Sequence, residues 1–171
     1  IYLQDRRRFS SIKIFTNKND HLNNFSNLGV DILTDKFTFD YFYSNISKSK
    51  KNICSFLMNQ NLFAGIGNYI KNEALYLSKV SPYRKTNNLR KNEVRLIFKN
   101  ILFVSFSNLH DWHNNYKIKI SDKILGLSPE YIESPYDFYI FDRETDNYGN
   151  NVVLDKKHCG RRTYYVKSIQ K

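Results

Sequence analysis

The stretch Met58-Asn-Gln-Asn-Leu-Phe-Ala-Gly-Ile-Gly-Asn-Tyr-Ile-Lys-Asn-Glu73 places Gly65, Gly67 and Asn68 between two segments with helical apolar spacing. Glycine permits φ > 0 and the close approach of another group, so the pattern predicts helix, tight turn, helix. The second helix would begin with unpaired N–H groups at the positive end of its dipole, which attracts anions. We therefore predict phosphate binding by Asn68 and the local amides. The alternative is an ordinary helix corner whose glycines serve packing alone.

The chain is strongly basic. Of its 171 residues, 27 are Lys or Arg and 16 are Asp or Glu, which gives a net charge of +11. This excess favours a nucleic-acid partner, although a soluble basic protein without such a partner would show it too. Hydrophobic residues make up 41%, which is enough for the packed core of one domain or two small ones.

Several classes of protein are excluded by what the sequence lacks. Cys54 and Cys159 form neither a disulfide framework nor a CxxC pair. We find no signal peptide and no apolar run long enough for a membrane, so we expect an intracellular protein without a membrane partner. Although His158 precedes Cys159, a structural zinc site needs four ligands at recognisable spacing. The sequence therefore predicts no metal and no cofactor.

The first third of the chain reads as a β-hairpin over 1–16 and a polar linker over 17–34 that leads to helices. Asp35 is the expected cap of a helix with the apolar face Phe39, Phe42, Tyr43 and Ile46. Asn52 is the expected cap of a short helix over 53–59, which enters the glycine turn. The helix after the turn should end near Ser81-Pro82, because proline cannot continue it.

The remainder predicts one long helix and a hairpin. Apolar residues recur at helical spacing over 91–110, and the polar segment 113–137 is interpreted as a long loop. Two strand-like runs, 152–154 and 163–166, flank a basic tip that contains Gly160-Arg-Arg162. The tip could reach phosphates or could be a plain exposed turn.

A second basic cluster, Arg6-Arg-Arg-Phe9, carries an aromatic side chain beside its charges. Phe9 could enter a duplex as a stacking wedge while an arginine contacts a base edge. The alternative is a solvated turn whose phenylalanine packs into a core. Glu73 could be catalytic, but we expect it to cap or orient the amides of the glycine turn.

Together these motifs resemble the Fpg/Nei (formamidopyrimidine/endonuclease VIII-like) DNA glycosylases. The resemblance is carried, in the family's order, by the following stretches: Asp5-Arg-Arg-Arg-Phe9, Leu28-Gly-Val-Asp31, Asn59 to Tyr76, Val80-Ser-Pro82, Gly160-Arg-Arg-Thr-Tyr-Tyr165 and Gln170. It covers nearly the whole chain but only the C-terminal part of a family member. The pattern Ile66-Gly-Asn-Tyr-Ile with Glu73 is most similar to the Nei-like-one branch of animals and large DNA viruses.

The resemblance implies a role for each matched residue. Asn68, with Gly65 and Gly67, would bind DNA phosphate, and Arg161 would be the arginine of the family's finger hairpin. Arg7 and Phe9 would fill the gap left by a flipped base and face the orphaned base. Val166 and Ile169 stand where zinc-binding members carry a cysteine pair, so the hairpin is similar to a zincless finger.

The family's nucleophile is an N-terminal proline followed by glutamate, on a β-sandwich domain. No residue of this chain matches that role, so we expect the N-terminal catalytic domain to be largely missing and the chain to be inactive alone. The expected architecture is mainly helical with small β parts. It comprises a remnant of the β-sandwich (1–16), a linker (17–34), a helix–two-turn–helix DNA-binding domain with a terminal loop (35–137) and a zincless-finger hairpin (138–171).

The expected function is the DNA-binding portion of a bifunctional glycosylase and abasic-site lyase acting on oxidised bases in base excision repair. The expected partner is duplex DNA with damaged bases or abasic sites, bound by a monomer in the nucleus or at a viral replication site. One alternative is a non-catalytic DNA-binding protein with the same module. Another is an RNA-binding protein of ribosomal type, since one such family also has a Gly-Ile-Gly turn between helices.

Overall fold

The computed structural model describes residues 14, 16–17, 19, 22, 26–116 and 136–171, without the side chains of 110–116. Its elements, in order, are β1 (Val30–Asp31), α2 (Phe39–Ser47), α3 (Ile53–Leu57), β2 (Phe63–Ala64), α4 (Asn68–Leu77), η1 (Thr86–Asn88), α5 (Lys91–Tyr116), β3 (Val153–Asp155), η3 (His158–Gly160) and β4 (Thr163–Tyr165). The predicted class, mainly α with small β parts, is confirmed. The expected hairpin over 1–16 lies outside the described residues, apart from Ile14 and Thr16.

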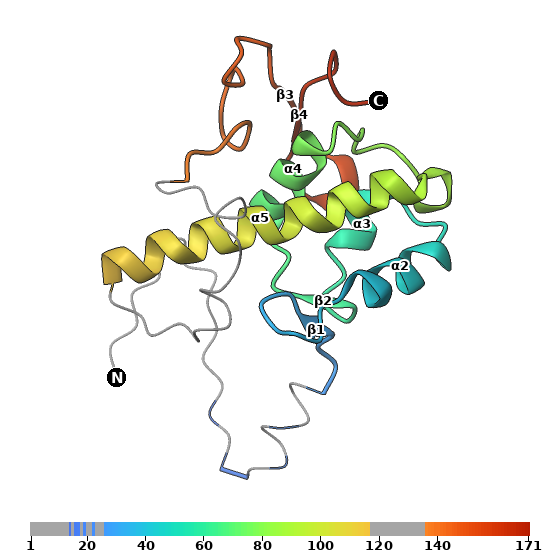
Figure 1. Cartoon of the computed structure of the whole chain (residues 1–171), viewed down its shortest axis with the longest axis vertical. Coiled ribbons are helices and arrows are strands. Elements are labelled where there is room, and N and C mark those ends of the chain that lie inside the picture. Colours follow the sequence, from blue (N-terminus) through green and yellow to red (C-terminus); the bar gives the residue numbers. More distant parts are fainter. Residues whose placement is uncertain (1–13, 15, 18, 20–21, 23–25, 117–135) are drawn as a thin grey trace.

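The long helix α5 crosses the molecule, with α4 between it and the β3–β4 hairpin (Figure 1). In that view the β1–β2 pair lies on the opposite side of α5 from the hairpin. The main core lies between the helices and is rich in phenylalanine, with the ring centroids of Phe42 and Phe63 5.3 Å apart. Fully buried members of this core include Phe42, Ile46, Ile53, Phe56, Leu57, Phe63, Ile66, Ala74, Ile97, Ile101 and Val104.

The helices α2 and α3 each begin at a side-chain cap. Thr38 accepts a hydrogen bond from the N–H of Tyr41 and starts α2, so the expectation that Asp35 caps this helix is wrong. Asn52 accepts from the N–H of Cys54 at 2.8 Å and starts α3, as predicted. A side-chain oxygen satisfies one of the N–H groups that a helix start leaves unpaired.

The last residues of the linker expected over 17–34 are part of the folded core. Val30 and Asp31 pair in parallel with Phe63 and Ala64, and Ile32 is buried in the core. Gly29 permits this approach, because a Cβ there would lie 2.2 Å from the carbonyl carbon of Leu62. The helical domain therefore begins before Asp35.

The helix α4 ends at Leu77, earlier than the proline at position 82 predicts. Lys79 adopts the left-handed conformation at φ 57°. Its N–H donates to Tyr76 O, and the N–H of Val80 donates to Leu75 O. These two bonds form a Schellman motif with lysine in the place that glycine usually takes.

The helix α5 is longer than predicted and reaches Tyr116, so the first residues of the expected loop over 113–137 are helical. Its start is capped by Glu93, whose carboxylate accepts from the N–H of Arg90 at 2.7 Å. This is the glutamate half of a capping box. None of the helices in the described part combines the length and apolar character that a membrane crossing needs.

Candidate nucleic-acid interface

The glycine turn is braced from within. Gly65 has φ +100°, which a residue with a side chain rarely adopts. The side chain of Gln60 holds both sides of the turn, because its Oε1 accepts from the N–H of Gly65 at 3.1 Å and its Nε2 donates to Ile66 O at 2.9 Å. The turn is thus fixed before any ligand arrives.

Gly67 lies at the N-cap of α4, and no side chain caps this helix. Its φ of −92° is open to any residue, and a Cβ built there would meet no atom within 4 Å. Nothing in the described part of the chain therefore requires glycine at this position. The open space beside Cα of Gly67 suits the close approach of an anion to the N–H groups at the start of α4.

Asn68, the first residue of α4, joins this helix start to the hairpin. Its Nδ2 donates to the main-chain oxygen of Arg162 at 2.9 Å. Its Oδ1 accepts from Nζ of Lys71 at 2.9 Å, and the same Nζ donates to Oγ1 of Thr163 at 3.1 Å. An amide NH₂ carries two donor hydrogens, so Asn68 keeps one for a ligand.

Lys71 is fully buried, and burial lowers the pKa of its ammonium, an effect that the nearby thiols of Cys54 and Cys159 oppose. Arg161 adds to the lowering, so the exposed guanidinium of the hairpin lies near enough to interact with this buried charge. The site is thus built from a buried cation with exposed basic residues at its rim. Such an arrangement attracts a polyanion.

The base of the hairpin is fastened to α4 by Glu73, a fully buried carboxylate. It accepts from the N–H groups of Tyr139, Ile140 and Phe141 at 2.8–2.9 Å, and from the hydroxyl of Tyr136 at 3.0 Å. The expectation that Glu73 orients the amides of the glycine turn is therefore wrong. Its role in this structure is to hold the segment that leads into the hairpin.

The chain that follows β4 is also held in place. Gln170 donates to Val80 O at 2.9 Å and accepts from the N–H of Val166 at 2.8 Å. The main chain of Lys171 bonds to Ser81 N and Lys79 O. The segment after α4 and the end of the chain are thereby joined.

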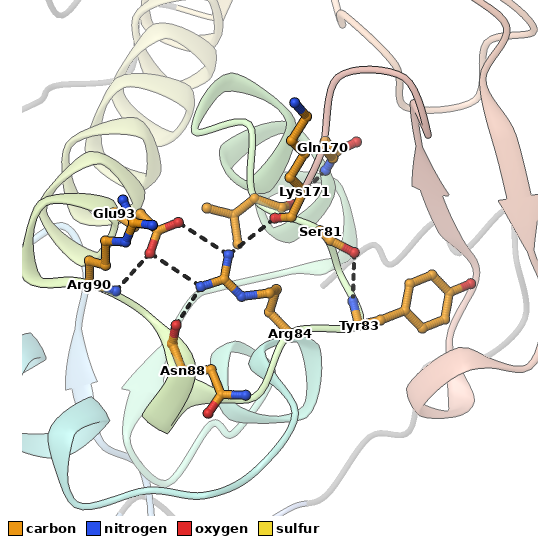
Figure 2. Close-up of polar contacts among 9 residues, drawn as sticks. Ser81, Tyr83, Arg84, Asn88, Arg90, Glu93, Gln170 and Lys171 are labelled. Carbon is orange, nitrogen blue, oxygen red and sulfur yellow. Dashed lines mark hydrogen bonds and ion pairs between the residues drawn. The ribbon is translucent and has the colours of Figure 1, made fainter.

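Arg84 links this junction to the start of α5 (Figure 2). Its guanidinium donates to Glu93 at 3.1 Å, to Lys171 O at 3.2 Å and to Asn88 O. Burial raises the pKa of Glu93, but hydrogen bonds from Arg90 and Arg84 outweigh it and hold that pKa below its ordinary value. Residues 84–93 and the main chain of Lys171, which are distant in sequence, are thus joined through one charged cluster.

The structure brings together four of the six residues predicted to bind DNA. Gly65, Gly67 and Asn68 belong to one turn, and Arg161 lies on the hairpin tip that contacts it. Arg7 and Phe9 lie outside the described residues. Sequence reasoning did not single out Gln60 or Lys71; the one available signal was a lysine three residues after Asn68, within the buried face of a helix.

Two cysteines and a histidine that the sequence does not pair are also brought together. Ligand atoms of Cys54, His158 and Cys159 all lie within 4.8 Å of one another. Their spacing along the sequence did not predict this proximity.

Comparison with known proteins gives the same picture of the fold. Residues 28–108 match the family described as "Formamidopyrimidine-DNA glycosylase H2TH domain". The chain is similar to the formamidopyrimidine-DNA glycosylase of Rickettsia felis, with 28% identity over 171 residues that cover 99% of this chain and 60% of the relative. The corresponding protein of a Wolbachia of Drosophila simulans is 29% identical, with 99% and 61% covered. The chain thus spans about three fifths of the length of these curated relatives.

Solved structures share the fold at lower identity. A complex between the Lactococcus lactis Fpg and DNA containing an abasic site has a TM-score of 0.67 at 21% identity, covering 90% of this chain and 56% of that chain. MutM in complex with DNA containing carbocyclic 8-oxo-G has a TM-score of 0.68 at 22% identity, with 90% and 55% covered.

Proposed function

We propose that this chain, which belongs to the Fpg/Nei family of DNA glycosylases, is the DNA-binding portion of an enzyme that removes oxidised bases in base excision repair. The contact between Asn68 and Arg162 supports this proposal most directly. It sets the uncapped start of α4 and the basic tip of the hairpin side by side, so both can reach one phosphate backbone.

In this proposal the chain binds the phosphate backbone of DNA and does not depend on the base sequence. The free N–H groups at the start of α4, the second hydrogen of the Asn68 amide and the guanidinium of Arg161 each donate to phosphate oxygens. Lys71 does not touch DNA, because it is fully buried. It places Asn68 and Thr163 through hydrogen bonds.

Lesion recognition and chemistry would be divided between this portion and other parts of the complete enzyme. Arg7 and Phe9 are proposed to fill the space of the flipped base and to face its partner. The complete enzyme would cleave the glycosidic bond and nick the strand by β- or β,δ-elimination. These 171 residues are proposed to bind as a monomer without cutting, wherever the genome is kept. Membership of the Nei-like-one branch, with a nuclear or viral site of action, stays a prediction beside relatives from bacteria.

The test is fluorescence anisotropy with two duplexes, one intact and one carrying an abasic-site analogue, over a series of salt concentrations. About four to six phosphate contacts give a slope of log K against log salt of roughly −4 to −5. Arg161→Ala should weaken binding to both duplexes. Lys48→Ala, which removes one exposed charge from the end of α2, is the matched control and should change affinity far less.

Two results would contradict the proposal. Equal losses for Arg161→Ala and Lys48→Ala would mean that net charge alone drives binding. Tighter binding to a folded RNA than to duplex DNA would favour the ribosomal-type alternative. Borohydride trapping of a covalent adduct with abasic DNA would separately overturn the expectation that these residues do not cut.

A further inference from the structure

Three metal-ligating side chains meet where the tip of the hairpin contacts α3. Cys54 lies on α3 and is fully buried, while His158 and Cys159 belong to η3 and are half-buried. One ligand atom from each lies within 4.8 Å of the other two. In a tetrahedral site with Zn–S near 2.3 Å and Zn–N near 2.0 Å, ligand atoms are roughly 3.5 Å apart, so a small contraction would close these three around an ion.

The three residues are held in place from both sides. The carbonyl oxygen of Pro82 lies 3.4 Å from Sγ of Cys54 and 3.0 Å from Nε2 of His158. Oδ1 of Asn52 lies 3.2 Å from Sγ of Cys159. The ring of Tyr83 packs on the imidazole with centroids 4.3 Å apart. The contact between Nε2 of His158 and a carbonyl oxygen is the kind that orients a metal-binding imidazole. The two thiols donate to their oxygen partners through the protons that a metal ion would replace.

The local charge also suits a divalent cation bound by thiolates. Exchange of two thiol protons for one Zn²⁺ leaves the net charge of the buried cluster unchanged. The ion can therefore enter without burying an uncompensated charge, even though Lys71 lies nearby.

We propose that Cys54, His158 and Cys159 bind one Zn²⁺ ion. Two sulfurs and one imidazole nitrogen are a donor set that this ion prefers, and a water molecule would complete the tetrahedron. Binding releases two protons to solvent and forms two Zn–S bonds and one Zn–N bond. In a zinc finger all the ligands come from the hairpin, whereas here one ligand, Cys54, comes from α3. The ion would therefore attach the hairpin tip to the core and hold the main chain next to Arg161 in place.

Cobalt spectroscopy gives the sharpest test, because Cys54 and Cys159 are the two cysteines of the sequence. The reduced chain, stripped with a chelator, is titrated with Co²⁺ and then with Zn²⁺. One equivalent of Co²⁺ should produce a thiolate-to-metal charge-transfer band and the visible bands of a tetrahedral ion, and Zn²⁺ should abolish both. Elemental analysis of chain purified without chelator should find about one zinc per chain.

Variants assign the ligands. Cys159→Ser should reduce the charge-transfer band, and His158→Ala should weaken Zn²⁺ binding by more than the roughly 10- to 100-fold that loss of an outer hydrogen-bond partner costs. Lys157→Ala, an exposed neighbour on the same turn, is the matched control and should leave both unchanged. Circular dichroism of each variant reports whether it is folded. The half-buried positions 158 and 159 avoid the disruption expected at Cys54.

The proposal is overturned if the reduced wild-type chain shows no charge-transfer band. It is also overturned if His158→Ala binds Zn²⁺ as tightly as wild type. A disulfide between Cys54 and Cys159 that survives the reducing conditions of purification, seen as loss of both free thiols in the unfolded chain, would equally exclude the metal site.

Discussion

The side-chain amide of Asn68 donates to the main-chain oxygen of Arg162 at 2.9 Å. This hydrogen bond joins the first turn of α4 to the hairpin tip, 94 residues further along the chain. Asn68→Ala removes the bond and a phosphate donor together, and we expect DNA affinity to fall by about 1.5–3 kcal/mol, the range for hydrogen bonds to charged groups. Anisotropy titration measures this loss.

The control for Asn68→Ala is Asn87→Ala, which truncates an exposed asparagine in η1. It should leave affinity within about twofold of wild type, since its side chain lies on a separate element and surface substitutions have small effects. Indistinguishable affinities for the two variants would remove Asn68 from the interface.

Lys71 is buried, and its pKa is lowered chiefly by burial. Where the ammonium is charged in the folded chain, its desolvation opposes folding. Between the folded pKa and the unfolded value of about 10.4, the unfolded chain binds more protons, so stability rises with pH. The unfolding free energy of wild type should therefore improve relative to Lys71→Met between pH 7 and pH 10, as measured by urea denaturation.

Lys71→Met should also weaken DNA binding, because Asn68 and Thr163 lose the group that places them. Lys85→Met, at an exposed lysine, is the control for both measurements. A stability difference that is constant or shrinks from pH 7 to pH 10 would contradict the assignment of a desolvated lysine.

Gly65 and Gly67 should respond differently to alanine. Gly65→Ala places a side chain at φ +100° with its Cβ 3.2 Å from Ile32, which should cost about 1–3 kcal/mol of stability. Gly67→Ala meets no atom of the described chain and should cost less than about 1 kcal/mol. Its methyl group occupies the space in front of α4, so DNA affinity should fall. Denaturation and anisotropy on both variants separate the two effects, and unchanged affinity in Gly67→Ala would count against phosphate binding there.

Asp146 makes the segment before β3 sensitive to acid. The carboxylate is 4% exposed and accepts from the hydroxyl of Tyr76 at 2.8 Å and the N–H of Asn150 at 2.8 Å. Burial raises its pKa, but hydrogen bonds from Asn150, Tyr76 and Tyr148 outweigh this and hold the pKa below its ordinary value. A lowered folded pKa contributes stability that is complete above about pH 5 and is lost as pH falls through the folded pKa.

Asp146→Asn should therefore destabilise the chain by about 1–3 kcal/mol at pH 7 and by less at pH 3. Asp137→Asn is the control, because that side chain is 77% exposed in its ion pair with Arg143 and such pairs contribute about 0–1 kcal/mol. Urea denaturation at both pH values is the measurement. An equal loss at pH 7 and pH 3 would contradict the titration of Asp146 as its cause.

Local signals account for the parts of the fold that were predicted correctly. Asn52 could be identified as a cap because a cap needs only neighbouring residues. The apolar face of α2 was visible at Phe39, Phe42 and Ile46 because helical spacing repeats within one segment. The hairpin was recognisable for the same reason. Its two strand-like runs flank a basic turn.

Features that depend on distant residues were missed. The β1–β2 pair has two residues in each strand, which is too short for an alternating pattern. The last turns of α5 continue after the apolar stripe weakens near Leu109, so periodicity placed the helix end too early. At the site, the meeting of Cys54 with His158 and Cys159 exists only because the hairpin folds back onto α3. No spacing along the chain signals it.

The hairpin is fastened at both of its ends, by Glu73 before β3 and by Gln170 after β4. The chain before β3 is thus held by α4, and the chain after β4 is held by the segment that follows α4, with the hairpin tip between these two attachments. Much of the conformational entropy of placing Arg161 is lost during folding and not during binding. Arg161 and the start of α4 therefore reach DNA already held in a fixed arrangement, and little conformational entropy is lost on binding. Differences in affinity between variants of this site should then appear mainly in the dissociation rate.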